Sequence, residues 1–261
     1  MKSDWKIIEH TKPKLNRPIL IAGMPGIGNV GKISMDLLIE ETKAQLIISF
    51  KSYKLPSSVF VNENNLVSLP KIELYYKKLS GQDFIFLTGD VQPITDESTY
   101  EFSEIIIELL EKFGGKEIIT LGGIGLSVVP EKPKIYITGN NAEYTKKVSN
   151  TFKKNKLPHE TQIYGVVGPI MGVSGLLLGL SKDKKINAAS LLAETFGHPI
   201  YVGLKGAREI LNAINTIFNF NIKLSKLDKE IQEIDDQIKG VSKENKSAIK
   251  YRKYPETNYI G

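Results

Sequence analysis

The sequence contains no cysteine and only three histidines among its 261 residues. The absence of cysteine excludes disulfides, thiol nucleophiles and thiolate metal sites, and it is typical of a protein that works in a reducing cytoplasm. The histidines, His10, His159 and His198, lie far apart in the sequence. We therefore expect no metal centre of the zinc or di-iron type, and we predict that the protein uses no cofactor.

The chain also has little excess charge of either sign, since 35 Lys and Arg residues face 29 Asp and Glu residues. Residues 240–261 carry five basic and two acidic residues, so about half of the excess lies there and the rest of the chain is nearly neutral. Nucleic-acid binding needs a basic face on the folded domain, so no nucleic-acid partner is expected. Residues 240–261 are predicted to form a flexible basic tail.

No apolar run with the features of a signal peptide is present, because the first ten residues are charged, and a cytoplasmic location is expected. Residues 161–181 have no charged residue and are long enough to cross a bilayer. They contain five glycines and a proline and lie between strand-like segments. We therefore predict no membrane span, and a helix over residues 173–180 whose glycines allow another backbone to approach closely.

Short apolar runs alternate with amphipathic segments along most of the chain. Helices are predicted at 30–41, 96–113 and 142–154, and buried strands at 18–23, 45–50, 84–88, 117–121, 134–138 and 162–167. Segments with alternating apolar residues at 58–61, 66–69 and 72–75 indicate a group of antiparallel strands. The glycines at 122–125 predict a turn. This order predicts an α/β fold with a mixed, mostly parallel sheet flanked by helices, in a single domain at residues 1–222.

The last amphipathic segment predicts one continuous long C-terminal helix, because apolar residues repeat at spacings of three and four from Ile210 to Ile238 without Gly or Pro. Up to Phe218 the apolar face is broad, as in a helix packed on its own domain; beyond Ile222 only a narrow stripe remains. Residues 223–239 are therefore predicted to protrude. The stripe either folds back on its own domain or contacts another subunit. We prefer the second interpretation, with an oligomer interface at Leu224, Leu227, Ile231, Ile234 and Ile238.

A glycine-rich turn after the first buried strand comes close to two nucleotide-binding motifs. Residues 26–31 fit G-x-G-x-x-G, but the second strand ends in Lys51 instead of the expected carboxylate. The same residues lack the hydroxyl side chain of a phosphate-binding loop, because Ile33 follows Lys32. We interpret the segment as a tight strand-to-helix turn. Its N–H groups at Gly26, Gly28 and Gly31 are a candidate anion-binding turn.

Catalytic serines are not indicated either, because neither Ser127 nor Ser174 has the second glycine of a nucleophile elbow. No catalytic residue is predicted. The alternative is a nucleotide or nucleoside binding enzyme that uses the Gly26–Gly31 turn and the region of Asp90, which follows a buried strand.

Five glycine-containing blocks, taken in order, resemble the archaeal members of the proteasome assembly chaperone 2 family. The blocks lie between residues 15 and 220 and are the segments at 18–31, 89–93 (Gly-Asp-Val-Gln-Pro), 121–125 (Leu-Gly-Gly-Ile-Gly), 168–172 (Gly-Pro-Ile-Met-Gly) and 194–197 (Glu-Thr-Phe-Gly). The resemblance implies an α/β fold similar to purine nucleoside phosphorylases, without a demonstrated catalytic activity. It also implies self-assembly and action on core proteasome α-subunits.

Some archaeal members of that family end in a hydrophobic-Tyr-any tripeptide that docks between α-subunits. This sequence departs from the pattern, because it ends in Asn258-Tyr259-Ile260-Gly261. From the residues and the resemblance together we predict a non-enzymatic homo-oligomer that binds other proteins, with core proteasome α-subunits as the expected partner.

Overall fold

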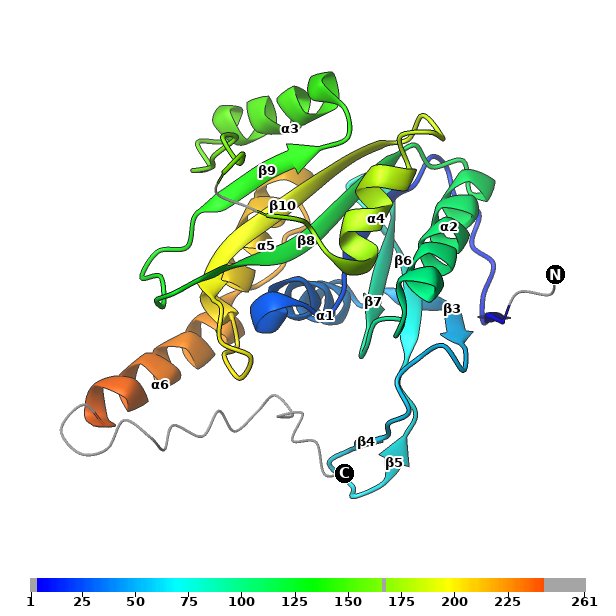
Figure 1. Ribbon diagram of the computed structural model, residues 1–261. Coiled ribbons are helices and arrows are strands. Elements are labelled where there is room, and N and C mark those ends of the chain that lie inside the picture. The colour runs from blue at the N-terminus through cyan, green and yellow to red at the C-terminus, as the bar shows by residue number, and fades with distance from the viewer. Residues whose placement is uncertain (1–3, 166–167, 242–261) are drawn as a thin grey trace.

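A mixed eight-stranded sheet is the centre of the computed structural model, which describes residues 4–165 and 168–241, with side chains as far as Asp236 in the last helix (Figure 1). The strand order is β1-β3-β6-β7-β2-β8-β10-β9. The strands are β1 (Lys6–Glu9), β2 (Ile19–Gly23), β3 (Gln45–Lys51), β6 (Ile72–Leu79), β7 (Gln82–Gly89), β8 (Glu117–Leu126), β9 (Ile135–Gly139) and β10 (Asn187–Phe196).

The centre of the sheet is parallel and its margins are antiparallel. Strand β2 pairs in parallel with β7 and β8, and β8 pairs in parallel with β10. Strands β9, β6 and β1 run the other way, while β3 has the direction of the central strands. The carboxyl ends of β3, β7, β2, β8 and β10 therefore all lie at one edge of the sheet, which we call the carboxyl edge. The predicted fold class, a mixed sheet with mostly parallel direction, is confirmed.

Helices cover both faces of the sheet (Figure 1). On one face lie α1 (Val30–Thr42), α3 (Ala142–Lys154), α5 (Leu204–Phe218) and α6 (Ser225–Val241), and on the other lie α2 (Asp96–Lys112) and α4 (Gly172–Leu180). Each face has its own apolar core. Strand β2 supplies Ile21 to the α1 side and Leu20 and Ala22 to the α2 side, as expected when side chains alternate along a strand that is buried on both faces.

Strand β8 corrects the sequence prediction of a turn at residues 122–125. The strand continues through these glycines to Leu126, and its parallel ladder with β10 extends to the pair Phe196 and Leu126. A side chain at Gly123 would overlap the carbonyl oxygen of Ile27. The glycine is therefore needed because another segment of backbone lies against this strand.

The C-terminal segment is two helices, so the prediction of one continuous helix was wrong. Asn219 and Asn221 adopt left-handed backbone conformations, with φ of 52° and 56°, which asparagine tolerates better than most residues. The Asn215 side chain bonds to both backbone groups of Ile222, at 3.1 and 3.2 Å. Between the helices Phe220 turns into the core, with its ring 4.7 Å from that of Phe84.

One further strand prediction needs correction, and two strands were missed. Residues 162–165 form no strand, and residues 166 and 167 lie outside the described part of the chain. Strands β1 and β10 were not predicted. No helix in the described residues is both long enough and apolar enough to span a membrane.

Candidate functional site

The glycine-rich turn lies at the carboxyl edge, between the end of β2 at Gly23 and the start of α1 at Val30. A short 3₁₀ turn, η1 (Ile27–Asn29), connects the two elements. Gly28 and Asn29 have positive φ angles of 59° and 50°, so the chain reverses here through left-handed conformations. The predicted strand, turn and helix are therefore present, and the glycine at position 28 is required by the backbone.

Two of the three motif glycines pack against the protein itself. A Cβ atom at Gly28 would lie 2.7 Å from Thr195 Oγ1, and one at Gly31 would overlap the carbonyl oxygen of Leu121. These glycines let the turn approach β10 and β8 closely. Gly26 differs, because a Cβ atom there would have no neighbour within 4 Å.

Hydrogen bonds join the turn to three other segments of the carboxyl edge. The Gly203 N–H, just before α5, donates to the Gly28 carbonyl at 2.8 Å. Gln92 Nε2 donates to the Pro25 carbonyl at 2.6 Å, and Gln92 Oε1 accepts the Val173 N–H in the first turn of α4 at 2.9 Å. Gln92 thus connects the ends of β2 and β7 to α4. Helix α1 itself has no side-chain cap, so anion binding by the turn stays a prediction.

Thr195 is a residue of this site that the sequence did not reveal. It is 1% exposed and lies between Gly28 and Gly203, and its Oγ1 has no hydrogen-bond partner among the described residues. A buried hydroxyl without a partner costs free energy. Only the packing of the two glycines against β10 identifies this position.

The charged groups beside the turn are paired with one another. Lys32 Nζ lies 2.8 Å from Asp36 and 3.4 Å from Asp90, and the Asp90 carboxylate also accepts the Lys71 N–H at 3.0 Å. Lys32 is therefore already engaged by two carboxylates, although it occupies the position of the lysine in a phosphate-binding loop. The described residues contain no cluster of three or more His, Asp or Glu side chains that could hold a metal ion.

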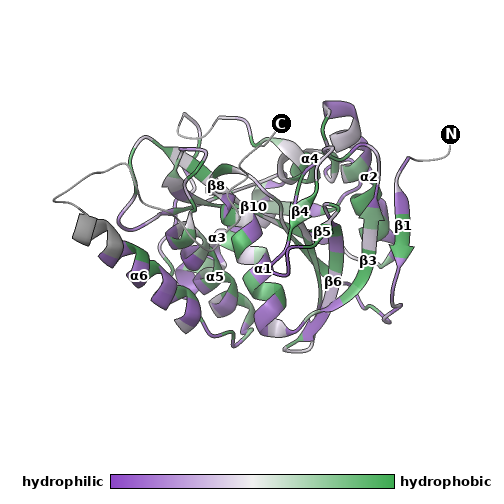
Figure 2. Ribbon diagram, turned by 90° about the horizontal axis from the view of Figure 1, so that it is seen from below, coloured by the Kyte–Doolittle hydropathy of each residue, from purple (hydrophilic) through white to green (hydrophobic). Residues whose placement is uncertain are grey.

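The apolar stripe on α6 lies against its own chain in the described residues. Helix α6 runs beside α5 (Figure 2), and Leu227 is 2% exposed, in the same core as α1 and α5. Leu224, Ile231 and Ile234 are partly buried against that core. The side chain of Ile238 lies outside the described residues. Contact between subunits through this stripe stays a prediction, and only the exposed parts of the three partly buried residues are available for it.

Ion pairs also attach α6 to α5. Arg208 Nε donates to Asp228 at 2.9 Å, and Lys205 Nζ lies 2.9 Å from Asp235. The hydrogen bond with Asp228 raises the pKa of the Arg208 guanidinium above its usual value. Because surface ion pairs each stabilise by only about 0–1 kcal/mol, burial of Leu227 contributes more to holding α6 in place.

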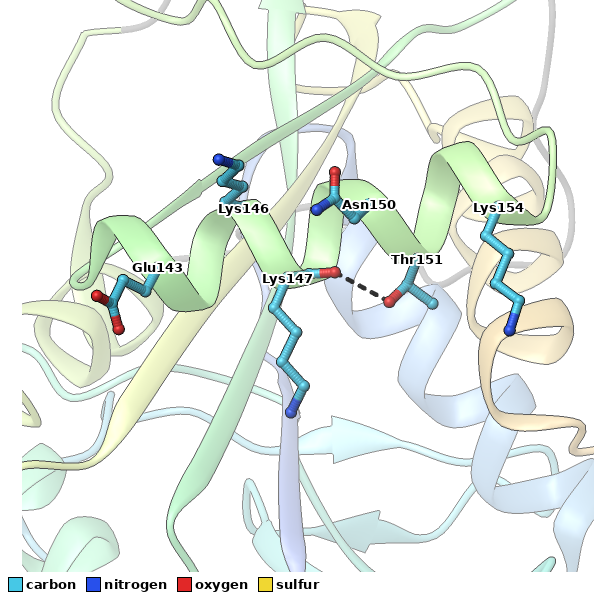
Figure 3. Close-up of a pocket in the computed structure, with 6 residues that line it drawn as sticks. All are labelled: Glu143, Lys146, Lys147, Asn150, Thr151 and Lys154. Carbon is cyan, nitrogen blue, oxygen red and sulfur yellow. Dashed lines mark hydrogen bonds between the residues drawn. The ribbon is translucent and has the colours of Figure 1, made fainter.

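A concavity of about 470 Å³ lies along the outer surface of α3 (Figure 3). Its six lining residues, shown as sticks, are Glu143, Lys146, Lys147, Asn150, Thr151 and Lys154. All of them belong to one helix, which cannot surround a ligand by itself. One of its lysines is also engaged, because Lys147 Nζ lies 3.3 Å from Glu117. We interpret this surface as the solvated face of an amphipathic helix.

Comparisons with known proteins place the chain among archaeal proteins of similar length. Two uncharacterized proteins of Methanocaldococcus jannaschii align with nearly all of it. MJ0106 is 27% identical over 257 residues, covering 98% of this chain and 99% of that protein. MJ1210 is 25% identical over 236 residues, covering 90% of this chain and 87% of that protein.

Two crystal structures from Pyrococcus furiosus share the fold. PbaB, described as an archaeal proteasome activator, is 28% identical, with a TM-score of 0.83 over 92% of this chain and 99% of that chain. PbaA, described as an archaeal homolog of proteasome-assembly chaperone, is 22% identical, with a TM-score of 0.75 over 92% of each chain. A sequence model of the PAC2 family matches residues 20–242, which is most of the sequence. The resemblance found in the glycine blocks is thereby confirmed, and the chain belongs to the PAC2 family.

Proposed function

We propose that this protein is a non-enzymatic homo-oligomer that binds core proteasome α-subunits, as a homologue of the proteasome assembly chaperones. The observation that carries the proposal is the similarity to PbaB, an archaeal proteasome activator, over 92% of this chain and 99% of PbaB. The match to the PAC2 family over residues 20–242 supports it.

The geometry of the glycine-rich turn also supports a protein-binding role. Gly28 and Gly31 face Thr195 and Leu121 of the same chain, and Lys32 is paired with two carboxylates. In this arrangement the motif serves to pack α1 tightly on the sheet. Several exposed apolar side chains lie on the segments at the carboxyl edge, and such side chains are suited to contact between protein chains.

The test is native mass spectrometry of the full-length protein mixed with proteasome α-subunits from the same organism. We expect a homo-oligomer and, in addition, mixed complexes of defined stoichiometry that dissociate on dilution. An unrelated protein of the same net charge serves as the control for charge-driven association. If no mixed complex forms at concentrations of tens of micromolar, the proposed partner is wrong.

The rival function is binding of a nucleotide or nucleoside by an enzyme that uses the Gly26–Gly31 turn. Two observations favour it: a Cβ atom at Gly26 would meet no other atom within 4 Å, and the adjacent N-terminus of α1 has no side-chain cap. Thermal unfolding with NAD, NADP, ATP or a purine nucleoside distinguishes the two functions. A ligand at 100 times its Kd stabilises by about 2.7 kcal/mol. We expect no shift of the melting temperature with any of these compounds; a saturable shift that is lost in Gly26→Val would favour the rival.

A further inference from the structure

Exposed apolar side chains gather at the carboxyl edge of the sheet. Among the described residues, fifteen large apolar side chains are exposed, and twelve of them lie on segments that follow β2, β3, β7, β8 or β10 or that begin α4. We call these twelve the apolar edge: Ile27, Tyr53, Val59, Val61, Leu66, Val67, Leu69, Ile94, Val128, Val129, Met171 and Ile200. Apolar residues that gather at one edge, in contrast to singly scattered ones, mark a candidate interaction site.

The densest part of the apolar edge is the hairpin of β4 (Phe60–Val61) and β5 (Val67–Ser68), which projects beyond the main sheet (Figure 1). Val61 is directly paired with Val67, so both side chains are on the same face of the hairpin. Val59 directly precedes β4 and Leu69 directly follows β5. These four side chains are 53 to 67% exposed. A two-stranded hairpin with an uncovered apolar face is at best marginally stable alone, which indicates that another surface covers it.

Charged residues are sparse on most segments of the apolar edge, although the hairpin segment 52–71 carries Lys54, Glu63 and Lys71. The segments 24–29, 91–95, 127–130, 168–172 and 197–203 contain no Asp, Glu, Lys or Arg, although a quarter of the whole chain is charged. The opposite edge of the sheet is different. Its connections carry the exposed residues Lys43, Lys116, Lys182, Lys184 and Lys185.

We infer that the apolar edge is covered by a second copy of this chain, which meets it through the same surface. Surfaces that bind a partner transiently are about as polar as the rest of a protein, whereas interfaces between permanently associated identical subunits are more apolar. A two-fold interface also places residues near the axis opposite their own copies. Charges of one sign would repel each other there, and five of the six segments of the apolar edge carry no charge over the ranges given above.

The size of the surface is consistent with a stable dimer. Such an interface needs about 800 Å² and 20–30 residues on each partner. The apolar edge supplies twelve exposed apolar residues from six segments toward that number. Helix α6 has less exposed apolar surface available for such a contact, because Leu227 is already buried in its own chain. The inference rests on the homo-oligomer of the proposed function and names the surface that forms it.

The first test is the mass of the full-length protein carrying Val61→Lys and Val67→Lys, measured by light scattering after size exclusion over a concentration series. Both side chains are more than half exposed, so lysine is compatible with the folded subunit. We expect the dissociation constant of the oligomer to rise about 100-fold or more. Tyr164→Lys is the matched control, since Tyr164 is 92% exposed and lies outside the apolar edge, and it should leave the mass unchanged.

A second test uses the absence of cysteine in the chain. Val61→Cys introduces a single thiol, so a short bis-maleimide reagent can join only two different subunits. We expect a covalent dimer for Val61→Cys and none for Tyr164→Cys. Wild-type mass in the double lysine variant, a monomeric wild type, or equal cross-linking of both cysteine variants would overturn the inference. Dissociation by Ile234→Asp with no effect of the lysines would instead place the interface on α6.

The two proposals fail separately. A monomeric protein that still binds α-subunits would contradict the apolar edge as a contact between copies, but not the partner. If the oligomer dissociates when the lysines are introduced but does not bind α-subunits, the apolar edge is supported as the contact between copies and the proposed partner is wrong.

Discussion

Replacing Gly31 by alanine tests whether the glycine-rich turn exists for packing. Gly31 lies in the first turn of α1, where alanine is intrinsically favoured over glycine by about 1 kcal/mol. The added Cβ atom, however, would overlap the carbonyl oxygen of Leu121 and lie 3.3 Å from that of Met24. Both oxygens belong to backbone that cannot rotate away. Relief therefore requires a shift of α1 or of the central strand β8.

The expected loss follows from these opposing contributions. Overpacking a tight interior costs typically about 1–3 kcal/mol and sometimes more, and contact with two backbone oxygens places this site at the upper end. After subtraction of the helix-propensity gain, we expect Gly31→Ala to lower the free energy of unfolding by about 2 kcal/mol or more. Gly26→Ala is the matched control. A Cβ atom there meets nothing within 4 Å, and φ is −173°, so stability should change by less than about 0.5 kcal/mol.

Urea unfolding followed by circular dichroism at 222 nm measures both variants, with equal slopes required before the free energies are compared. The variants should also be compared at several protein concentrations, because subunit association changes apparent stability. If Gly31→Ala is as stable as the wild type, or if Gly26→Ala is equally damaging, the turn is not held by the contacts described above and the packing argument is refuted.

Three further predictions concern other positions. Thr195→Val replaces an unpartnered buried hydroxyl by a methyl group of the same shape. It should raise the free energy of unfolding in urea titrations by about 1 kcal/mol, whereas Thr195→Ser, which keeps the hydroxyl, should not. Asn215→Ala removes both hydrogen bonds to Ile222 and should lower the free energy of unfolding by about 2 kcal/mol in the same titrations. Burial, and then the charge of Glu117, raise the pKa of the Tyr144 hydroxyl above its usual value near 10. Its contribution to stability is therefore complete below pH 10 and declines at higher pH, so unfolding measured at pH 9 and 11 should show a smaller decline for Tyr144→Phe than for the wild type.

The centre of the fold could be predicted because its strands are buried on both faces. The apolar runs of β2 and β7 stand out from their surroundings, and glycine-rich or capped segments mark the ends of the helices between them. The capping cluster before α2 is an example: Thr95 accepts the Ser98 N–H at 3.2 Å, and the Ser98 hydroxyl accepts the Thr95 N–H at 3.0 Å. Local chemistry of this kind is visible in the sequence because both partners lie within one turn.

The errors occurred where a distant segment decides the local structure. Glycines at 122–125 predict a turn locally, but they form a strand whose missing side chains admit the backbone of Ile27. The apolar spacing from Ile210 to Ile238 continues through a break that only two left-handed asparagines and the burial of Phe220 reveal. In both cases the residue pattern is compatible with two conformations, and contacts with residues far away in the sequence select one.

The apolar edge could not be predicted for a related reason. Its twelve residues come from six segments spread from Ile27 to Ile200. Residues 58–61 and 66–69 alternate visibly, but alternation does not tell whether the apolar face is covered; the other five segments are too short and too rich in glycine, proline or asparagine to show a periodic pattern. Only the shared direction of β3, β7, β2, β8 and β10 brings these segments to one edge. The stripe on α6 is conspicuous in the sequence because it is periodic, yet Leu227 is buried by its own chain. Periodicity therefore identifies an apolar face without telling which chain covers it, and the location of unburied apolar residues in the folded subunit is the stronger guide to the surface where copies meet.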